Sequence, residues 1–166
     1  MKRIKLTQGQ FALVDDKDYE FLQQWKWCAS FDKHCQGFYA TSNRHRWENK
    51  KPIVIKMARI IMDAKKGQII DHINHNTLDN RRKNLRICTP AQNSYNKRKS
   101  MRNTTGYKGV SKCTSLCRYY KKDVFQAQIR VKGKLITLGY GTNKRQLARL
   151  YQDASIKYFG KFAHKN

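Results

Sequence analysis

Acidic side chains are scarce in this sequence. Its 166 residues include 11 Asp and Glu against 36 Lys and Arg, which gives a formal net charge of +25. Self-repulsion of that size destabilises a compact chain, so a polyanionic partner is expected, and nucleic acid is the leading candidate. A basic surface that serves only solubility is less favoured. An anionic membrane surface is less favoured still, because no basic amphipathic helix with a clean apolar face is found.

Long apolar runs are absent as well. No segment approaches the ~18 apolar residues of a membrane-spanning helix, so no membrane partner is expected. The N-terminal stretch MKRIKLTQGQFALVDD lacks the apolar core of a secretory signal. Without an export signal, the odd number of five cysteines indicates reduced thiols in a cytoplasmic protein. Nine Tyr, seven Phe and three Trp are enough for a folded core and exclude a disordered basic tail.

The short apolar runs predict an α+β chain with two folded domains, residues 1–98 and 106–166. The first domain begins with a β-rich extension. Its expected elements are two short strands around Gly9, a helix within 15–27, a strand over 37–41 and a polar stretch from Trp47 to Pro52.

The rest of the first domain predicts the order strand, loop, strand, helix. Residues 53–64 are apolar without a clean period and favour a helix or a strand-to-helix packing segment. A strand is expected after Gly67, a loop over 74–82 and a second strand over 84–88. Thr89-Pro90 fits an N-cap followed by Pro at the first helical position, so a helix is expected over 90–96.

A strongly basic stretch follows. Between Asp79 and Asp123 there are thirteen Lys or Arg and no acidic residue. Its middle, residues 99–105, is interpreted as a basic linker that tracks a phosphate backbone rather than reading bases. The second domain then predicts three strands, in YKGVSK, FQAQIRV and KLITLGYG, and a helix over 143–159 with Thr142 as its N-cap. Residues at helical spacing in it are Leu147, Ala148, Leu150, Tyr151, Ala154 and Tyr158.

The most informative segment is residues 71–96, DHINHNTLDNRRKNLRICTPAQNSYN. It begins with an adjacent carboxylate and imidazole, Asp71 and His72. A carboxylate can hold a divalent metal, and a neutral imidazole can accept a proton from water. Carboxamides can add an oxygen ligand or tie loops together, and guanidinium groups bind phosphate. These are the parts needed to hydrolyse a phosphodiester. The carboxamides are Asn80, Asn84, Asn93 and Asn96, and the cations are Arg81, Arg82, Lys83 and Arg86.

The succession of DH, NRRKNLR and QNSYN resembles the HNH nuclease family, in the form found in phage-type homing endonucleases with a ββα-metal site. The resemblance implies that Asp71 binds the metal, His72 is the general base, Asn84 orients the loop and Asn93 is the second metal ligand. The set is thus a His-Asn-Asn variant. The family commonly has a His at the place of Ala58.

The residue chemistry is consistent with that resemblance. Two protein oxygens, from Asp71 and Asn93, leave most of an octahedral shell open, which suits Mg²⁺, with Mn²⁺ as an alternative. His72, with an unperturbed pKa of ~6.5, can be neutral at pH 7. Adjacent residues on a strand face opposite ways, so Asp71 and His72 share a site only where the strand ends or bends.

Simpler roles compete for the neighbouring polar residues. His75 could be a second base or ligand, but a solvated loop histidine is favoured. Asn80 and Asn96 are expected to make turn and cap hydrogen bonds rather than to touch metal.

The second domain, from Gly106 onward, resembles the Apetala-two/ethylene-response-factor (ERF) type of plant DNA-binding domain. The resemblance rests on YKGV, AQIR, LGYG, ARLYQDASIKYFG and FAHKN. It implies a sheet that lies in the major groove. Residues 113–123 are a local variation, and Phe125 and Thr137 stand near the places of the family's tryptophans, so base preference is not transferred. By position, the groove face holds Lys108, Lys112, Gln128, Arg130 and Thr137.

Phosphate contacts are expected from two basic groups. Near the cut they are Arg81, Arg82, Lys83 and Arg86, and in the basic stretch they are Lys97, Arg98, Lys99 and Arg102.

The cysteines allow one further interpretation, a zinc site. Cys113-x₃-Cys117 has a tolerable half-site spacing, and Cys28 with Cys35 could complete it. The two halves lie in different expected domains, so buried or loop thiols are the simpler account.

Taken together, the residues predict a metal-dependent endonuclease that nicks double-stranded DNA. The resemblance implies the homing type and a location in the host cytoplasm of a phage that encodes the protein. One site per chain predicts a nick by a monomer. A double-strand break would require two chains or sequential cutting, so monomer and dimer both stay open. One alternative is a non-catalytic duplex-DNA-binding protein, such as a regulator with a decayed nuclease domain. The other is an RNA-binding basic protein, which is disfavoured because no RNA module is found.

Overall fold

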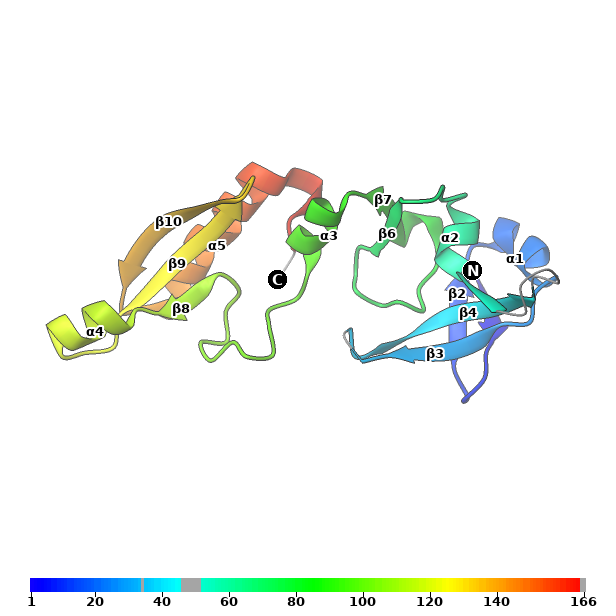
Figure 1. Ribbon diagram of the computed structural model, residues 1–166, viewed down its shortest axis with the longest axis horizontal. Coiled ribbons are helices and arrows are strands. Elements are labelled where there is room, and N and C mark those ends of the chain that lie inside the picture. The colour runs from blue at the N-terminus through cyan, green and yellow to red at the C-terminus, as the bar shows by residue number, and fades with distance from the viewer. Residues whose placement is uncertain (34, 46–51, 165–166) are drawn as a thin grey trace. The chain divides into compact units, whose positions relative to one another are not determined.

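The computed structural model describes residues 1–33, 35–45 and 52–164, and it divides into two compact units, Met1–Pro90 and Ala91–Asn166 (Figure 1). The division precedes nearly all of the helix over 90–96, which the sequence analysis placed in the first domain. Both units mix helices with small antiparallel sheets. Of the polar stretch expected from Trp47 to Pro52, residues 47–51 lie outside the described residues. No helix among the described residues is long and apolar enough to cross a membrane.

The N-terminal unit holds three small antiparallel sheets. Strands β1 and β2 form the expected hairpin, whose turn contains Gly9 at φ +67°, a conformation that favours glycine. Strands β3, β4 and β5 form a three-stranded sheet, of which β3 was not expected from the sequence. Strands β6 and β7 form the expected antiparallel pair. The bounds are β1 Lys2–Lys5, β2 Phe11–Val14, β3 Cys28–Asp32, β4 Gly37–His45, β5 Pro52–Lys56, β6 Ile69–His72 and β7 Leu85–Cys88.

One hydrophobic core joins several parts of the N-terminal unit. It takes residues from the β1–β2 hairpin, from α1 (Asp16–Leu22), from α2 (Met57–Ile61) and from β7. Trp27 is buried in this core, and its Nε1 donates a hydrogen bond to the Leu22 carbonyl at 2.8 Å. Ala58 is also buried in this core. The position where the resembled family often has a histidine is therefore a packed core position in this protein. The β-rich extension therefore folds together with the segment that carries Asp71 and His72.

The C-terminal unit contains a three-stranded sheet in the order β10-β9-β8 with one long helix, α5, packed across it (Figure 1). This confirms the expected three strands and helix. The short helix α4 between β8 and β9 was not expected. The bounds are α3 Pro90–Asn96, β8 Val110–Lys112, α4 Thr114–Tyr120, β9 Phe125–Val131, β10 Lys134–Gly141 and α5 Lys144–Phe159.

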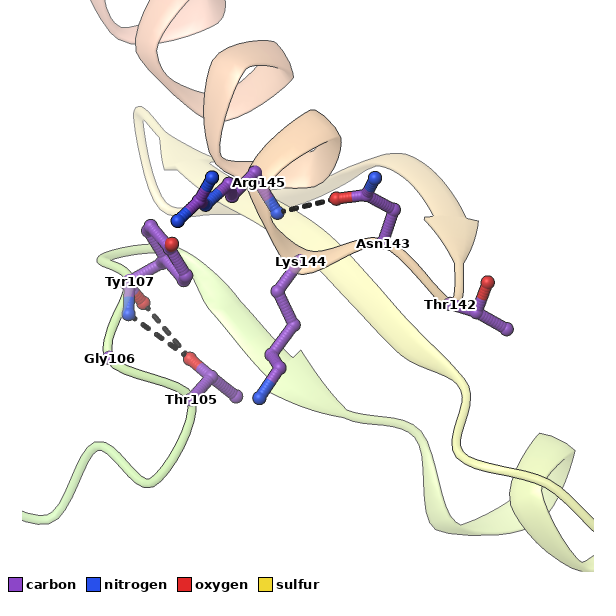
Figure 2. Close-up of a pocket in the computed structure, with 7 residues that line it drawn as sticks. All are labelled: Thr105, Gly106, Tyr107, Thr142, Asn143, Lys144 and Arg145. Carbon is purple, nitrogen blue, oxygen red and sulfur yellow. Dashed lines mark hydrogen bonds between the residues drawn. The ribbon is translucent and has the colours of Figure 1, made fainter.

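The start and the buried face of α5 differ from the sequence expectation. Asn143, not Thr142, is the N-cap, because its side-chain oxygen accepts a hydrogen bond from the backbone N–H of Arg145 (Figure 2) and another from that of Gln146. Leu150 and Tyr158, two of the residues noted at helical spacing, are exposed. Their places are taken by neighbours on the sheet-facing side of the helix. The buried residues are Leu147, Ala148, Tyr151, Ala154, Ser155 and Phe159.

Helix α3 packs within the C-terminal unit. The Tyr95 ring stacks on the Phe159 ring, with centroids 3.7 Å apart and an interplanar angle of 7°. The Lys108 Nζ donates to the backbone carbonyls of Tyr95, at 2.7 Å, and Lys97, at 2.6 Å. Burial lowers the pKa of Lys108 to about 8. Lys108 therefore closes the C-terminal end of α3, where a cation is favourable, and does not lie on the groove face where the sequence placed it.

Candidate functional site

Asp71 and His72 are the last two residues of β6, where the strand ends as the sequence required. The chain turns at once, since the His75 N–H donates to the His72 carbonyl at 3.0 Å and His75 has a φ of +62°. The loop to Arg81 then returns to β7. Both Asp71 and His72 are buried.

Asn84, the last residue of a 3-10 turn over Arg82–Asn84 just before β7, fastens this loop. Its Nδ2 donates to the Asp79 carbonyl at 2.8 Å, and its Oδ1 accepts from the Asn74 N–H at 3.0 Å. The hairpin supports the loop from the other side, where Leu13 N–H donates to the Leu78 carbonyl and Asn80 N–H donates to the Leu13 carbonyl, both at 2.8 Å. The loop is therefore held by hydrogen bonds that originate in two distant parts of the sequence.

Asn80 orients the His72 ring. The two side chains meet at 3.3 Å between His72 Nε2 and Asn80 Oδ1. Asn80 Nδ2 donates to the Leu78 carbonyl at 3.3 Å, which leaves Oδ1 as the acceptor toward His72. Nε2 is therefore the donor in this contact, which in a neutral ring leaves the lone pair on Nδ1. The sequence analysis assigned Asn80 only a turn or cap bond and missed this contact. No sequence signal reveals it, because it depends on the path of the whole loop.

The surroundings of His72 favour its neutral form. Burial lowers the pKa of His72 and outweighs the opposing effects of the Asn80 hydrogen bond and of the Asp71 and Asp79 charges. The Tyr39 ring of β4 lies against it, with centroids 6.1 Å apart at an interplanar angle of 64°. A buried neutral imidazole with a defined tautomer can act as a proton acceptor.

Asp71 is paired with Arg86 across the β6–β7 ladder. Its Oδ2 accepts from Arg86 Nε at 2.8 Å and from Arg86 Nη2 at 2.6 Å. Both side chains are largely buried, at 8% and 12% exposure. In this structure Arg86 therefore neutralises Asp71, whereas the sequence analysis expected it to hold a phosphate.

The neighbouring arginines are paired as well. Arg81 Nη2 lies 2.6 Å from Asp79 Oδ2, and Arg82 Nη2 lies 2.7 Å from Asp18 Oδ1 of α1. The Arg81 hydrogen bonds hold the pKa of Asp79 below its usual value. Three of the four expected phosphate-binding cations are thus paired with carboxylates, and Arg82 ties its segment to α1. The fourth, Lys83, is exposed.

The donor set limits the kind of metal that this site suits. Among the described residues, no group of three or more His, Cys, Asp or Glu side chains is arranged to hold a metal ion. One carboxylate, Asp71, is nevertheless compatible with Mg²⁺, which keeps most of its waters. Such an ion would share the carboxylate with Arg86 or displace it. Asn93, the expected second ligand, belongs to α3 in the C-terminal unit and is half-buried.

The cysteines considered for a zinc site belong to different units, as the simpler account of separate thiols requires. Cys28 and Cys35 lie in the N-terminal unit, and Cys113 and Cys117 lie in the C-terminal one. The Cys117 Sγ accepts from the Val124 N–H at 3.2 Å and donates to its carbonyl at 3.3 Å, so this thiol fastens α4 to the start of β9.

The C-terminal sheet presents a polar face opposite α5. Gln128 pairs with Thr137 across β9 and β10, and Arg130 pairs with Leu135, so all three predicted residues of these strands share that face. Gln126 and Tyr140 pair on the same face and were missed by the sequence analysis. Lys112 does not belong to it, because it pairs with the inward-facing Phe125 and forms an ion pair with Asp123 at 2.5 Å.

A hollow of about 790 Å³ lies beside the N-terminus of α5 (Figure 2). Lys144 and Arg145 contribute its cationic side chains, and the Lys144 Nζ lies 5.1 Å from the centroid of the Phe125 ring. The rest of the wall comes from Thr105, Gly106, Tyr107, Thr142 and Asn143.

Comparison with known proteins finds a family match for the segment around His72. Residues 63–95 match the HNH endonuclease family model. A protein described as an uncharacterized HNH endonuclease, from Acanthamoeba polyphaga mimivirus, is 37% identical over 97 residues, which cover 58% of this chain and 46% of that protein. Protein 3.8 of Escherichia phage T7 is 46% identical over 46 residues, which cover 28% of this chain and 38% of that protein. No solved structure matches the chain.

Residues 63–95, which include β6, the loop and β7, are thus similar to HNH endonucleases, and this similarity supports a DNA endonuclease. The chain spans less than half the length of either curated relative, so the activity of the whole protein is a matter for proposal. The Apetala-two likeness of the C-terminal unit stays a prediction.

Proposed function

We propose that this protein is a metal-dependent endonuclease of the homing type that nicks double-stranded DNA. The observation that carries the proposal is the arrangement of His72, which is buried, neutral and held by Asn80 at the end of β6, inside the segment that matches the HNH endonuclease family. A phage or other virus is the proposed source, since both curated relatives are viral, and the host cytoplasm is the proposed location.

His72 would act as the general base. With its hydrogen on Nε2, the imidazole offers Nδ1 to a water molecule and takes its proton as that water attacks the phosphorus. Asn80 then stabilises the imidazolium that forms, because its Oδ1 keeps accepting the Nε2 hydrogen bond. Asn84 contributes by holding the loop that positions Asn80.

Asp71 and Asn93 would hold a divalent ion, with Mg²⁺ favoured and Mn²⁺ possible. When bound, that ion supplies charge neutralisation at the phosphate and at the departing 3′-oxygen. Arg86 orients Asp71 through two hydrogen bonds to its Oδ2. The role of Asn93 rests on its place in the QNSYN motif.

The C-terminal unit would bind the duplex through the polar face of its sheet, with Gln128, Arg130 and Thr137 toward the groove. The basic stretch and Lys83 would contact the phosphate backbone, and such contacts make affinity depend steeply on salt. The stretch contributes Lys97, Arg98, Lys99 and Arg102, all exposed. One site per chain implies a nick for each binding event of a monomer.

A supercoiled-plasmid assay tests the proposal. Wild type, His72→Ala and Asp71→Ala are incubated with Mg²⁺ or Mn²⁺, with EDTA as the control. Metal-dependent conversion to nicked circles that both variants lose is the expected result.

The second candidate function is duplex binding without catalysis, as in a regulator. The Arg86 ion pair on Asp71 favours it, because the carboxylate already has a cationic partner. Intact duplex binding with no cleavage under either metal would establish it.

A further inference from the structure

We propose that Lys56 is a catalytic residue that contacts the scissile phosphate beside His72, and that Tyr39 is the positioning residue that holds it there. The inference rests on the proposed nuclease function and adds two residues outside the matched segment 63–95. Lys56 is the last residue of β5, and Tyr39 lies in the neighbouring strand β4.

The Tyr39 ring links the lysine to the histidine. The Lys56 Nζ lies 3.7 Å from the ring centroid, and the same ring lies 6.1 Å from the His72 ring centroid. A cation over an aromatic face is attracted by the ring while it keeps its full charge. Tyr39 is itself half-buried, which restricts the motion of its ring.

The other cations near His72 serve different purposes. Arg81, Arg82 and Arg86 are each paired with a carboxylate. Among the described residues near the imidazole, Lys56 is the cation that contacts an aromatic ring instead of a carboxylate. Its positive charge acts on His72. Lys56 is also exposed, so a DNA phosphate can reach it from solvent.

This placement matches a need of phosphodiester hydrolysis. Negative charge grows on the non-bridging oxygens as water attacks and the 3′-oxygen departs, and a preorganised donor there lowers the barrier. The ammonium beside the proposed base can supply such a donor. Tyr39 would limit the freedom of the Lys56 side chain before substrate binds, which reduces the entropy lost at binding.

The test compares Lys56→Met and Lys56→Arg with Lys66→Met, a matched control on an exposed lysine of the same unit. Single-turnover nicking is measured at saturating protein, and duplex affinity is measured separately in EDTA. We expect Lys56→Met to slow nicking by about 100-fold, as loss of one charge-stabilising donor does, while affinity changes far less. Lys56→Arg should recover much of the rate, and Lys66→Met should match wild type. Tyr39→Leu should slow nicking less than Lys56→Met does.

Two outcomes would overturn the inference. One is a Lys56→Met protein that nicks as fast as wild type, while His72→Ala is inactive. The other is a loss of rate that saturating protein restores, because Lys56 would then contribute only to binding.

A readout without cleavage separates this inference from the proposed function. The Lys56 side-chain methylene protons should show a ring-current shift in NMR spectra that disappears in Tyr39→Leu, and duplex DNA in EDTA should perturb those resonances. If wild type never nicks DNA, the proposed function fails. If duplex DNA also leaves the Lys56 resonances unchanged, the contact inferred here fails independently.

Discussion

The hydrogen bonds of Asn84 make the clearest stability prediction for the site. Asn84 is 6% exposed, and its two side-chain bonds, at 2.8 and 3.0 Å, join the two ends of the loop between β6 and β7. Replacement by alanine removes both bonds and leaves the Asn74 N–H and the Asp79 carbonyl without those partners. At about 1 kcal/mol for each bond plus a desolvation cost, Asn84→Ala should destabilise the N-terminal unit by about 2–3 kcal/mol.

Tryptophan fluorescence measures the unfolding of the N-terminal unit alone, because Trp25, Trp27 and Trp47 all precede residue 91. Urea unfolding followed by this signal reports on the N-terminal unit. Asn43→Ala, at an exposed position of β4, is the control and should stay within about 0.5 kcal/mol of wild type. Hydrogen exchange at the Asn74 amide supplies a local readout and should accelerate in Asn84→Ala. An unchanged urea midpoint together with unchanged hydrogen exchange at the Asn74 amide would refute this stabilising role of Asn84.

Three further predictions concern pH, backbone strain and DNA contacts. Because burial lowers the pKa of His72, the neutral base predominates above the ordinary value of ~6.5, so nicking should lose rate only below that pH; a midpoint above pH 7 would contradict this. By the same linkage the unfolded chain binds more protons just below ~6.5, so the stability of the N-terminal unit should fall as pH drops through that range in urea titrations. Gly109 has a φ of +75°, and an added Cβ would lie 1.9 Å from Tyr151 Cδ2, so Gly109→Ala should unfold the C-terminal unit in circular dichroism, whereas Gly139→Ala, with its nearest contact at 3.3 Å, should be milder. Filter binding across salt should show that Arg130→Met lowers the slope of log affinity against log salt by about 0.9, while Lys108→Met leaves it unchanged because its ammonium binds carbonyls; equal slopes for the two variants would count against this assignment.

Local sequence signals predicted the elements that depend on neighbouring residues. Thr89-Pro90 marked the start of α3, the alternation in FQAQIRV marked β9, and the spacing of Leu147, Tyr151 and Ala154 marked α5. Their boundaries were less accurate, because the cap of α5 depends on which of two adjacent polar residues reaches the free N–H groups.

The partners of the charged residues in the site were not predictable in the same way. Arg82 meets Asp18 across 64 positions of sequence, and Arg86 meets Asp71 only through the register of β6 and β7. A guanidinium in an otherwise basic segment indicates a phosphate ligand until the fold brings a carboxylate to it. The helix α4 was missed because it has only seven residues and buries none of their side chains, so no periodic apolar pattern marks it in the sequence.

The sequence by itself determined the chemistry available to this protein: an adjacent Asp71 and His72 at a strand end, asparagines after them, and an excess of cations that calls for a polyanion. These properties follow from residue identity and short-range spacing. Only the tertiary structure decided which atoms meet. In the fold Asn80 contacts His72, and three arginines form ion pairs with carboxylates. Lys108 binds backbone carbonyls at the end of α3, and the Tyr39 ring lies between Lys56 and the imidazole. Such contacts join residues far apart in the chain, and burial of one shared core in the N-terminal unit and packing on α5 in the C-terminal unit select them.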